Sequence, residues 1–183
     1  PVGIDQAPHI EFAREIVRSF NYRYGKQVLI EPQMKNTKIL KVLGIDGKEK
    51  MGKSLNNHIE IASTPEETGK RVMQMVTDPQ RLRRNDPGNP DVCNVFSMHK
   101  IFSTEEEVAQ INADCRTAAL GCVDCKKRLA ANMNKGLEPF RAKRAELDAK
   151  PQYVRDVLED GAKRARAIAE KTMEEVREAI QLP

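Results

Sequence analysis

A loop rich in lysine and glycine is the first place in this sequence where side chains could do chemistry. Lys50, Met51, Gly52, Lys53 and Ser54 follow one another directly and are called the lysine loop below. Lysine is a flexible point charge, and a mobile loop that contains glycine can follow a polyphosphate as negative charge develops on it. The simpler alternative is a solvated surface loop, and charge alone favours that alternative.

A second short motif, Gly3-Ile4-Asp5-Gln6, stands directly before a predicted helix. Glycine allows the backbone to approach a ligand closely. Asp and Gln at the start of a helix can accept hydrogen bonds from a polar substrate and donate to it. The alternative is a plain helix cap, in which Asp5 holds the first turn. Four residues by themselves do not decide between these interpretations.

All the cysteines of the chain lie in one short region. They are Cys93, Cys115, Cys122 and Cys125, with gaps of 21, 6 and 2 residues. The last two form a C-x-x-C pair, a spacing that lets two thiolates bind one metal centre. Four isolated buried cysteines are the alternative, but the grouping favours a metal. Four thiolates suit either zinc or an iron–sulfur cluster, and the spacing leaves both open.

The composition narrows the class of protein that must position these groups. The chain has 39% hydrophobic, 32% charged and only 4% aromatic residues, which favours helices over an all-β fold. A net charge of +4 permits contact with nucleic acid without establishing it. No apolar run reaches the length of a membrane span and no signal peptide opens the chain, so we expect a cytoplasmic protein without a membrane partner. Cysteines in such a chain serve metals more often than disulfides.

The first part of the chain alternates between helical and strand patterns. Apolar spacing predicts a helix over residues 8–23. A short apolar run predicts a buried strand at 27–31, and a second strand is expected at 38–45. This alternation is typical of half a parallel α/β sheet, a partial Rossmann-like nucleotide-binding half.

The rest of the chain is predicted to be an all-α domain, so the protein is mostly helical overall. Capping signals start one helix at Thr64 and another at Ser103–Thr104. Everything after Cys125 has a helical pattern, in which Pro139 should kink or divide one helix and Pro151 should open the next.

Three stretches resemble one enzyme family. The lysine loop resembles the second signature loop of class I aminoacyl-tRNA synthetases, usually Lys-Met-Ser-Lys-Ser, with Gly52 at the first serine. Gly3-Ile4-Asp5-Gln6 resembles the Gly-x-Asp-Gln motif of the tryptophanyl and tyrosyl enzymes. Residues 76–79 and the basic turn at 81–90 resemble the tryptophanyl-tRNA synthetases and not the tyrosyl ones. The resemblance covers nearly all of the 183 residues.

This resemblance implies an activity and a role for each matching residue. The family activates tryptophan with ATP and Mg²⁺, and then transfers it from the adenylate to tRNA(Trp). Lys50 and Lys53 would stabilise the pyrophosphate as catalytic residues. The residues expected against ATP are Gly3, Asp5, Met51, Gly52 and Ser54. Val2 and Gln6 would meet the amino acid.

The resemblance also bears on the cysteines and on the organisation of the chain. Some tryptophanyl enzymes carry a closely similar four-cysteine pattern that holds a 4Fe–4S cluster near the anticodon, which favours iron–sulfur here and leaves zinc as the runner-up. Residues 1–60 would be the C-terminal half of the catalytic domain, and 61–183 the helical anticodon-side domain. The first signature of the family is absent, so we expect a fragment that is inactive alone and a homodimer in the full-length enzyme. The rival hypothesis is a non-catalytic, metal-stabilised tRNA-binding module.

Overall fold

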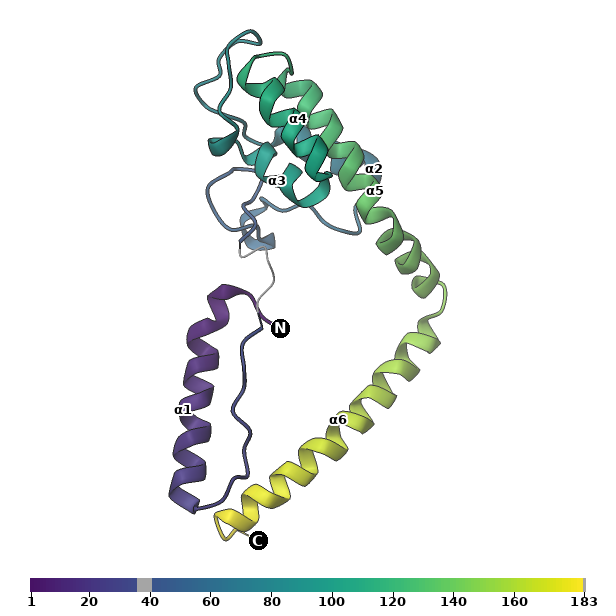
Figure 1. Ribbon diagram of the computed structural model, residues 1–183. Helices are drawn as coiled ribbons and strands as arrows, with labels where there is room; N and C mark the ends of the chain where they lie inside the picture. The colour runs from purple at the N-terminus through teal and green to yellow at the C-terminus, as the bar shows by residue number, and fades with distance from the viewer. Residues whose placement is uncertain (36–40, 183) are drawn as a thin grey trace. The chain divides into compact units, whose positions relative to one another are not determined.

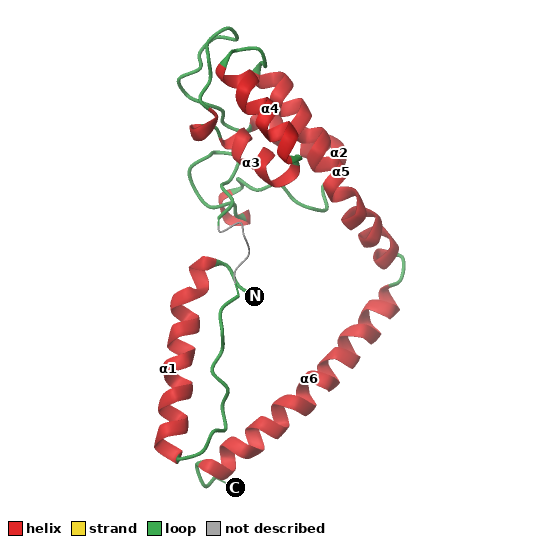
Figure 2. Ribbon diagram, viewed as in Figure 1, coloured by secondary structure: helices red, strands yellow, loops and turns green. Residues whose placement is uncertain are grey.

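The structure is a computed structural model that describes residues 1–35 and 41–182. Its contacts divide the chain into two compact units (Figures 1 and 2). The first unit combines both ends of the chain, residues 1–41 and 147–183, and the second is residues 42–146. Each unit is described by itself. The division into residues 1–60 and 61–183 stays a prediction.

The first unit begins with a short 3-10 helix, η1 (Ile4–Gln6), that leads into α1 (Ala7–Tyr24). The helix predicted over residues 8–23 is therefore confirmed. Pro8 stands in its first turn, where the missing N–H group costs nothing, and Gly25 ends it in the left-handed conformation at φ 64°. Val17 is the side chain of α1 that is buried.

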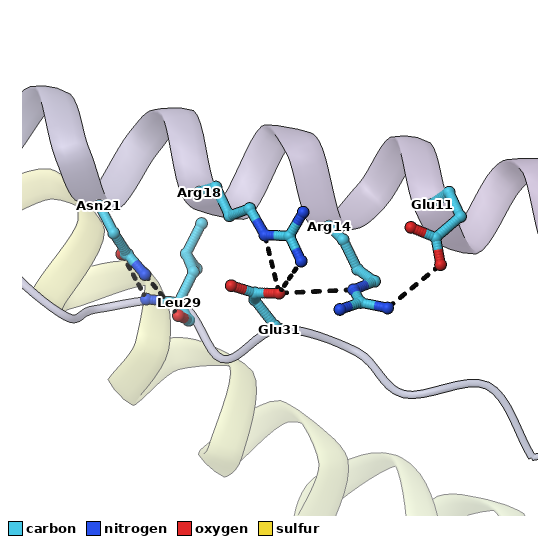
Figure 3. Close-up of polar contacts among 6 residues, drawn as sticks. All are labelled: Glu11, Arg14, Arg18, Asn21, Leu29 and Glu31. Carbon is cyan, nitrogen blue, oxygen red and sulfur yellow. Dashed lines mark hydrogen bonds and ion pairs between the residues drawn. The ribbon is translucent and has the colours of Figure 1, made fainter.

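Polar side chains of α1 hold the segment that follows it (Figure 3). The side-chain oxygen of Asn21 accepts hydrogen bonds from the backbone N–H groups of Val28 and Leu29, each at 3.1 Å. Glu31 forms ion pairs with Arg18 at 2.8 Å and Arg14 at 3.4 Å. The hydrogen bond from Arg18 is the main reason why the pKa of Glu31 lies below its usual value.

The buried strand predicted at residues 27–31 is wrong. These residues contain no strand, and the side chain of Ile30 is 91% exposed. A strand requires a neighbouring backbone, whereas the N–H groups of Val28 and Leu29 are bonded to a side chain. Of the second predicted strand, residues 38–40 lie outside the described residues, and 41–45 form only an isolated bridge at Leu43. The Rossmann-like half is thus not confirmed, and the described residues are mostly helical.

The second unit contains most of the helices. They are α2 (Pro65–Gln74), α3 (Asn94–Phe102), α4 (Glu105–Arg116) and nearly all of the long α5 (Cys122–Asp148). The 3-10 helix η2 (Lys53–Leu55) precedes α2, and η3 (Pro90–Val92) precedes α3. Both predicted capped starts are confirmed. Thr64 and Thr104 each accept a hydrogen bond from the third helical residue, whose glutamate side chain bonds back to the cap.

A hydrophobic core joins the helices of the second unit. Five of its side chains are almost completely buried: Val72 in α2, Met75 directly after α2, Val95 in α3, and Leu129 and Met133 in α5. Met51 from the lysine loop packs against the same core. The loop is therefore fixed to the unit by an apolar contact, while its lysines stay exposed.

Proline acts differently at the two positions in the C-terminal part. Pro139 lies inside α5, which continues through it to Asp148 without division. Contacts on both sides support this part of α5, since Asn134 donates to the carbonyl of Pro65 and Arg141 donates to Thr68 Oγ1 at 2.8 Å. Pro151 opens α6 (Pro151–Ala179), as predicted. Among the described residues, no helix combines the length and the apolar character that crossing a membrane requires.

Candidate functional site

The first motif forms a compact turn before α1. A side chain at Gly3 would lie 2.5 Å from Oδ1 of Asp5, so glycine lets the carboxylate fold back over the backbone. The amide of Gln6 donates to Asp5 Oδ2 at 3.3 Å. Asp5 lies within η1, and α1 starts at Ala7 without a side-chain cap, so the interpretation of Asp5 as the cap of that helix is wrong. Val2 is half-buried and its N–H donates to the carbonyl of Lys35.

The lysine loop stands on a tight turn at the start of the second unit. Leu43 and Lys50 form an antiparallel bridge, the N–H of Gly44 donates to Glu49 O, and the N–H of Met51 donates to Val42 O, both at 2.9 Å. The turn reverses at Gly47, whose φ of 67° favours glycine. The backbone on one side of the loop is therefore fixed.

The other side of the lysine loop is held from α2. Lys53, Ser54 and Leu55 form η2, after which Asn56 takes a left-handed conformation at φ 49°. Arg71 donates to the carbonyl of Asn56 at 2.6 Å and to that of His58 at 3.1 Å. Lys50, Lys53 and Ser54 are exposed between these two supports. The loop can therefore present two ammonium groups and a hydroxyl to a ligand from a fixed base.

Gly52 has room for a side chain. Its backbone is extended, with φ −163° and ψ 148°, a conformation that any residue adopts. A Cβ atom there would lie 3.9 Å from Lys50 O and 4.0 Å from Ser54 Oγ, which are ordinary contacts. A serine at this position would therefore cause neither a clash nor backbone strain.

The four predicted cysteines line a single cavity, called the cysteine cavity below. Cys93 directly precedes α3, Cys115 lies near the end of α4, and Cys122 and Cys125 lie in the first turn of α5. The cavity has a volume of about 20 Å³, room for roughly one water molecule. Its other lining residues are Thr77, Arg81, Val95 and Leu120. All four thiols are free in this structure.

The cysteine cavity does not have the geometry of a finished metal site. Among the residues that the structure describes, no three His, Cys, Asp or Glu side chains are arranged to hold an ion. Burial, together with the neighbouring sulfurs, raises the pKa of Cys125 to about 12, so its thiol is neutral. Burial is also the main cause that raises the pKa of Cys115. The predicted metal site is therefore not confirmed, although the four predicted cysteines line one cavity.

Two features beside Cys115 suit a centre built from sulfur. A Cβ atom at Gly88 would lie 2.6 Å from Cys115 Sγ, so only glycine leaves space for the sulfur there. Arg81 donates to the carbonyls of Leu120 at 2.9 Å and Arg84 at 2.7 Å, and its Nη1 lies 3.9 Å from Cys115 Sγ. The buried Nε of Arg81 has no partner among the described residues. The wall of the cavity thus carries a positive charge and an N–H group that is available to donate a hydrogen bond.

A groove with arginines lies next to the cysteine cavity and is called the arginine groove below. It has a volume of about 290 Å³. Its lining residues are Thr77, Arg81, Leu82, Arg83, Arg84, Gly121, Cys122, Val123 and Asp124. The groove contains the first residues of α5, where the helix dipole adds partial positive charge. Guanidinium groups and a helix N-terminus both favour phosphate oxygens.

Sequence reasoning missed three residues that support these sites. Asn57 holds the lysine loop, His99 contacts Cys125, and Arg81 donates to the carbonyls of Leu120 and Arg84 beside the cysteine cavity. Asn57 and His99 are 3% and 0% exposed. A buried polar residue beside a motif is a weak signal in a sequence, because its partners lie far along the chain. The lysine loop and the cysteines could be found because the residues of each group lie close together in the sequence.

Comparison with known proteins identifies the family of this chain. The model of the family described as "tRNA synthetases class I (W and Y)" matches residues 1–138. The chain therefore belongs to the class I tRNA synthetases of the tryptophan and tyrosine family.

The individual relatives are tryptophan enzymes. The Tryptophan--tRNA ligase of Aquifex aeolicus is 48% identical over 184 residues, covering 100% of this chain and 46% of its own length. That of Thermotoga maritima is 46% identical over 183 residues, covering 100% and 55%. The solved tryptophanyl-tRNA synthetase of Campylobacter jejuni, complexed with ADP and tryptophan, has a TM-score of 0.79 and 32% identity, covering 100% of this chain and 56% of that one. The chain spans about half the length of the curated relatives it matches.

Proposed function

We propose that this chain is part of a tryptophan–tRNA ligase, which activates tryptophan with ATP and transfers it from the adenylate to tRNA(Trp). The observation that carries the proposal is the lysine loop, which presents Lys50, Lys53 and Ser54 from a base fixed on both sides. The tryptophan ligases that match over the whole chain support tryptophan as the substrate. Most of the catalysis in such a reaction is positioning and charge stabilisation, which ammonium groups on a supported loop can supply.

The proposed roles of the residues follow the two motifs. Lys50 and Lys53 stabilise the pyrophosphate as it leaves, and Mg²⁺ accompanies the phosphates. The ATP contacts are assigned to Gly3, Asp5, Met51, Gly52 and Ser54. Val2 and Gln6 are assigned to tryptophan. The exposed carboxylate of Asp5 and amide of Gln6 support these roles, because both remain accessible to a polar ligand.

We assign residues 1–60 to the catalytic domain and 61–183 to the helical anticodon-side domain of this enzyme. A homodimer is the proposed assembly, by resemblance to the family. A cytoplasmic location is part of the same proposal.

For the cysteine cavity, a 4Fe–4S cluster is the proposed group and zinc is the runner-up. Four thiols from three chain segments, the space left by Gly88 and the unpartnered Nε of Arg81 all suit a sulfur-ligated centre. The resemblance in cysteine spacing supports the cluster, whereas the volume of about 20 Å³ supports a single ion. When bound, either group would tie α3, α4 and α5 together and stabilise the fold. An anaerobic preparation, its absorption spectrum and a metal analysis distinguish the two.

The arginine groove is the proposed contact with tRNA. Arg83 and Arg84 are exposed beside the start of α5, so they can meet backbone phosphates. Replacing both with glutamine should weaken tRNA binding and reduce its dependence on salt. An unchanged affinity and salt dependence would remove this surface from the proposal.

The activity is tested by tryptophan-dependent pyrophosphate exchange in a synthetase that contains this chain. Exchange with tryptophan and not with tyrosine is the expected result. Exchange with tyrosine alone would overturn the substrate assignment.

The rival function is a non-catalytic tRNA-binding module, and one observation favours it. The cysteine cavity and the arginine groove both lie within the second unit, so neither needs the residues of the first motif. A preparation of these 183 residues alone that binds tRNA without pyrophosphate exchange would fit this module. Exchange by that preparation would exclude it.

A further inference from the structure

A buried asparagine three residues after the lysine loop bonds to the middle of that loop. Oδ1 of Asn57 accepts a hydrogen bond from the N–H of Gly52 at 2.8 Å. Its Nδ2 donates to Asp46 Oδ2 at 2.9 Å and lies 3.4 Å from the carbonyl of Lys50. We propose that Asn57 is the positioning residue of the lysine loop, linking Gly52 at its centre to Asp46 in the turn beneath it.

Asn57 is itself held in one orientation. Its side chain is 3% exposed, and its backbone carbonyl accepts from the N–H of Ile45 at 2.8 Å. A methyl group at Gly44 would overlap this side chain, so glycine at position 44 makes the space that Asn57 fills. Gly44 is fixed in turn, because its carbonyl accepts from the amide of Asn94 in α3 at 2.7 Å. The loop is thereby connected to the helical core.

Asp46 determines which way the side-chain amide of Asn57 is turned. Oδ1 of Asp46 accepts from the backbone N–H groups of Lys48 at 3.0 Å and Glu49 at 3.4 Å. The hydrogen bond from Lys48, followed by that from Asn57, keeps the pKa of Asp46 below its usual value. An ionised Asp46 accepts only, so Asn57 must turn its NH₂ group towards Asp46 and its oxygen towards Gly52. The amide orientation is therefore set by this chemistry.

The consequence concerns the two lysines. Lys50 and Lys53 flank Gly52, so a hydrogen bond at Gly52 limits the movement of both stems without touching either ammonium group. Pre-positioned charges act on a transition state without first having to be ordered. This inference rests on the proposed function of the lysine loop, but the link itself can be tested without activity.

The test exchanges the two side chains of the link. Asn57→Asp places two carboxylates against each other. Asp46→Asn leaves one side-chain oxygen at position 46, which cannot accept both from the backbone N–H groups of Lys48 and Glu49 and from Asn57. Each single variant should therefore release Gly52. The double variant Asp46→Asn/Asn57→Asp restores a donor–acceptor pair and still offers an oxygen to Gly52. Amide hydrogen exchange at Gly52, measured by NMR on the 183-residue chain, should rise about tenfold in each single variant and return towards the parent in the double variant.

Asn94→Asp is the matched control. It removes a buried amide that bonds to the same turn but does not contact Gly52. Its melting temperature should fall, as in the single variants, while exchange at Gly52 stays near that of the parent. Equal acceleration in Asn94→Asp, or a double variant that recovers its melting temperature without protecting Gly52, would overturn the proposal. If Asn57→Asp does not fold, Asp46→Asn and the double variant still carry the comparison.

A second measurement separates this proposal from the proposed function. In a synthetase that contains this chain, each single variant should lower kcat for pyrophosphate exchange with little change in KM for ATP, and the double variant should regain kcat. If Gly52 exchange follows the swap while kcat stays constant in every variant, the link stands and the catalytic role of the loop is wrong.

Discussion

Nε2 of His99 lies 3.2 Å from the carbonyl oxygen of Cys125 and 3.5 Å from its sulfur. A carbonyl only accepts, so Nε2 carries the hydrogen and donates. Nδ1 then accepts from the hydroxyl of Ser103 at 2.6 Å, and that hydroxyl accepts from Asn132 at 2.9 Å. The start of α5, with one wall of the cysteine cavity, is thus joined to α3 by a neutral, buried histidine.

The stability of the metal-free chain should depend on pH through His99. Burial is the main cause that lowers its pKa in the folded state, so the unfolded chain binds a proton at a higher pH than the folded one. The contribution of His99 to the free energy of unfolding should therefore be fully present above the unfolded pKa of about 6.5. It should be lost as the pH falls towards the lower pKa of the folded state. Urea unfolding between pH 5 and 8 measures this slope. If His99 is responsible, the free energy of unfolding of His99→Gln should depend less steeply on pH than that of the parent. An equally steep dependence would mean that another group causes it.

Lys53→Ala should slow turnover far more than it weakens ATP binding. A charge that meets the phosphates mainly in the transition state contributes on the order of 2–4 kcal/mol to the barrier. Pyrophosphate exchange and ATP binding, measured on a synthetase that contains this chain, give the two quantities. Lys135→Ala, an exposed lysine on α5, is the control for loss of charge. If ATP binding collapses while turnover holds, the loop binds the ground state instead.

Gly52→Ser should be tolerated, with a modest change in activity. The extended backbone and the contacts at 3.9 and 4.0 Å leave space for the side chain. The melting temperature should stay within roughly 2 °C of the parent, because no strain or burial changes. A large gain in turnover would show that the serine hydroxyl typical of the family contributes a contact that this chain lacks.

Cys122→Ser should destabilise the second unit and weaken tRNA charging, while adenylate formation continues. Cys122 lines both the cysteine cavity and the arginine groove, so loss of its sulfur should affect the proposed metal centre and the adjoining surface. Metal content, melting temperature and aminoacylation of tRNA are the measurements. Ala131→Ser, at an exposed position of α5 outside the cavity lining, is the control. Equal metal content in Cys122→Ser and the parent would contradict the assignment of Cys122 as a ligand.

Sequence patterns succeeded where the signal was local. Thr64 and Thr104 start helices because each cap and its glutamate are three residues apart, so the bonds form within one turn. The cysteines were found by grouping, and helix ends then bring them to one cavity. Residues 27–31 were misread because an apolar run becomes a strand only when another backbone pairs with it. Asn57 and His99 could not be predicted, since their roles depend on partners such as Asp46 and Cys125, which the fold brings into contact.

Helix α6 differs from the rest in how it is stabilised, and this affects unfolding experiments. None of its described side chains is buried, and Leu158 and Ile168 are 67% and 72% exposed. Its support includes local pairs one turn apart, such as Gln152 with Asp156 and Asp160 with Arg164. Such pairs contribute only about 0.2–0.5 kcal/mol each. Circular dichroism, which averages over all helices, should therefore report loss of α6 before the core opens, and a single two-state fit would underestimate the stability of the helices around the cysteine cavity.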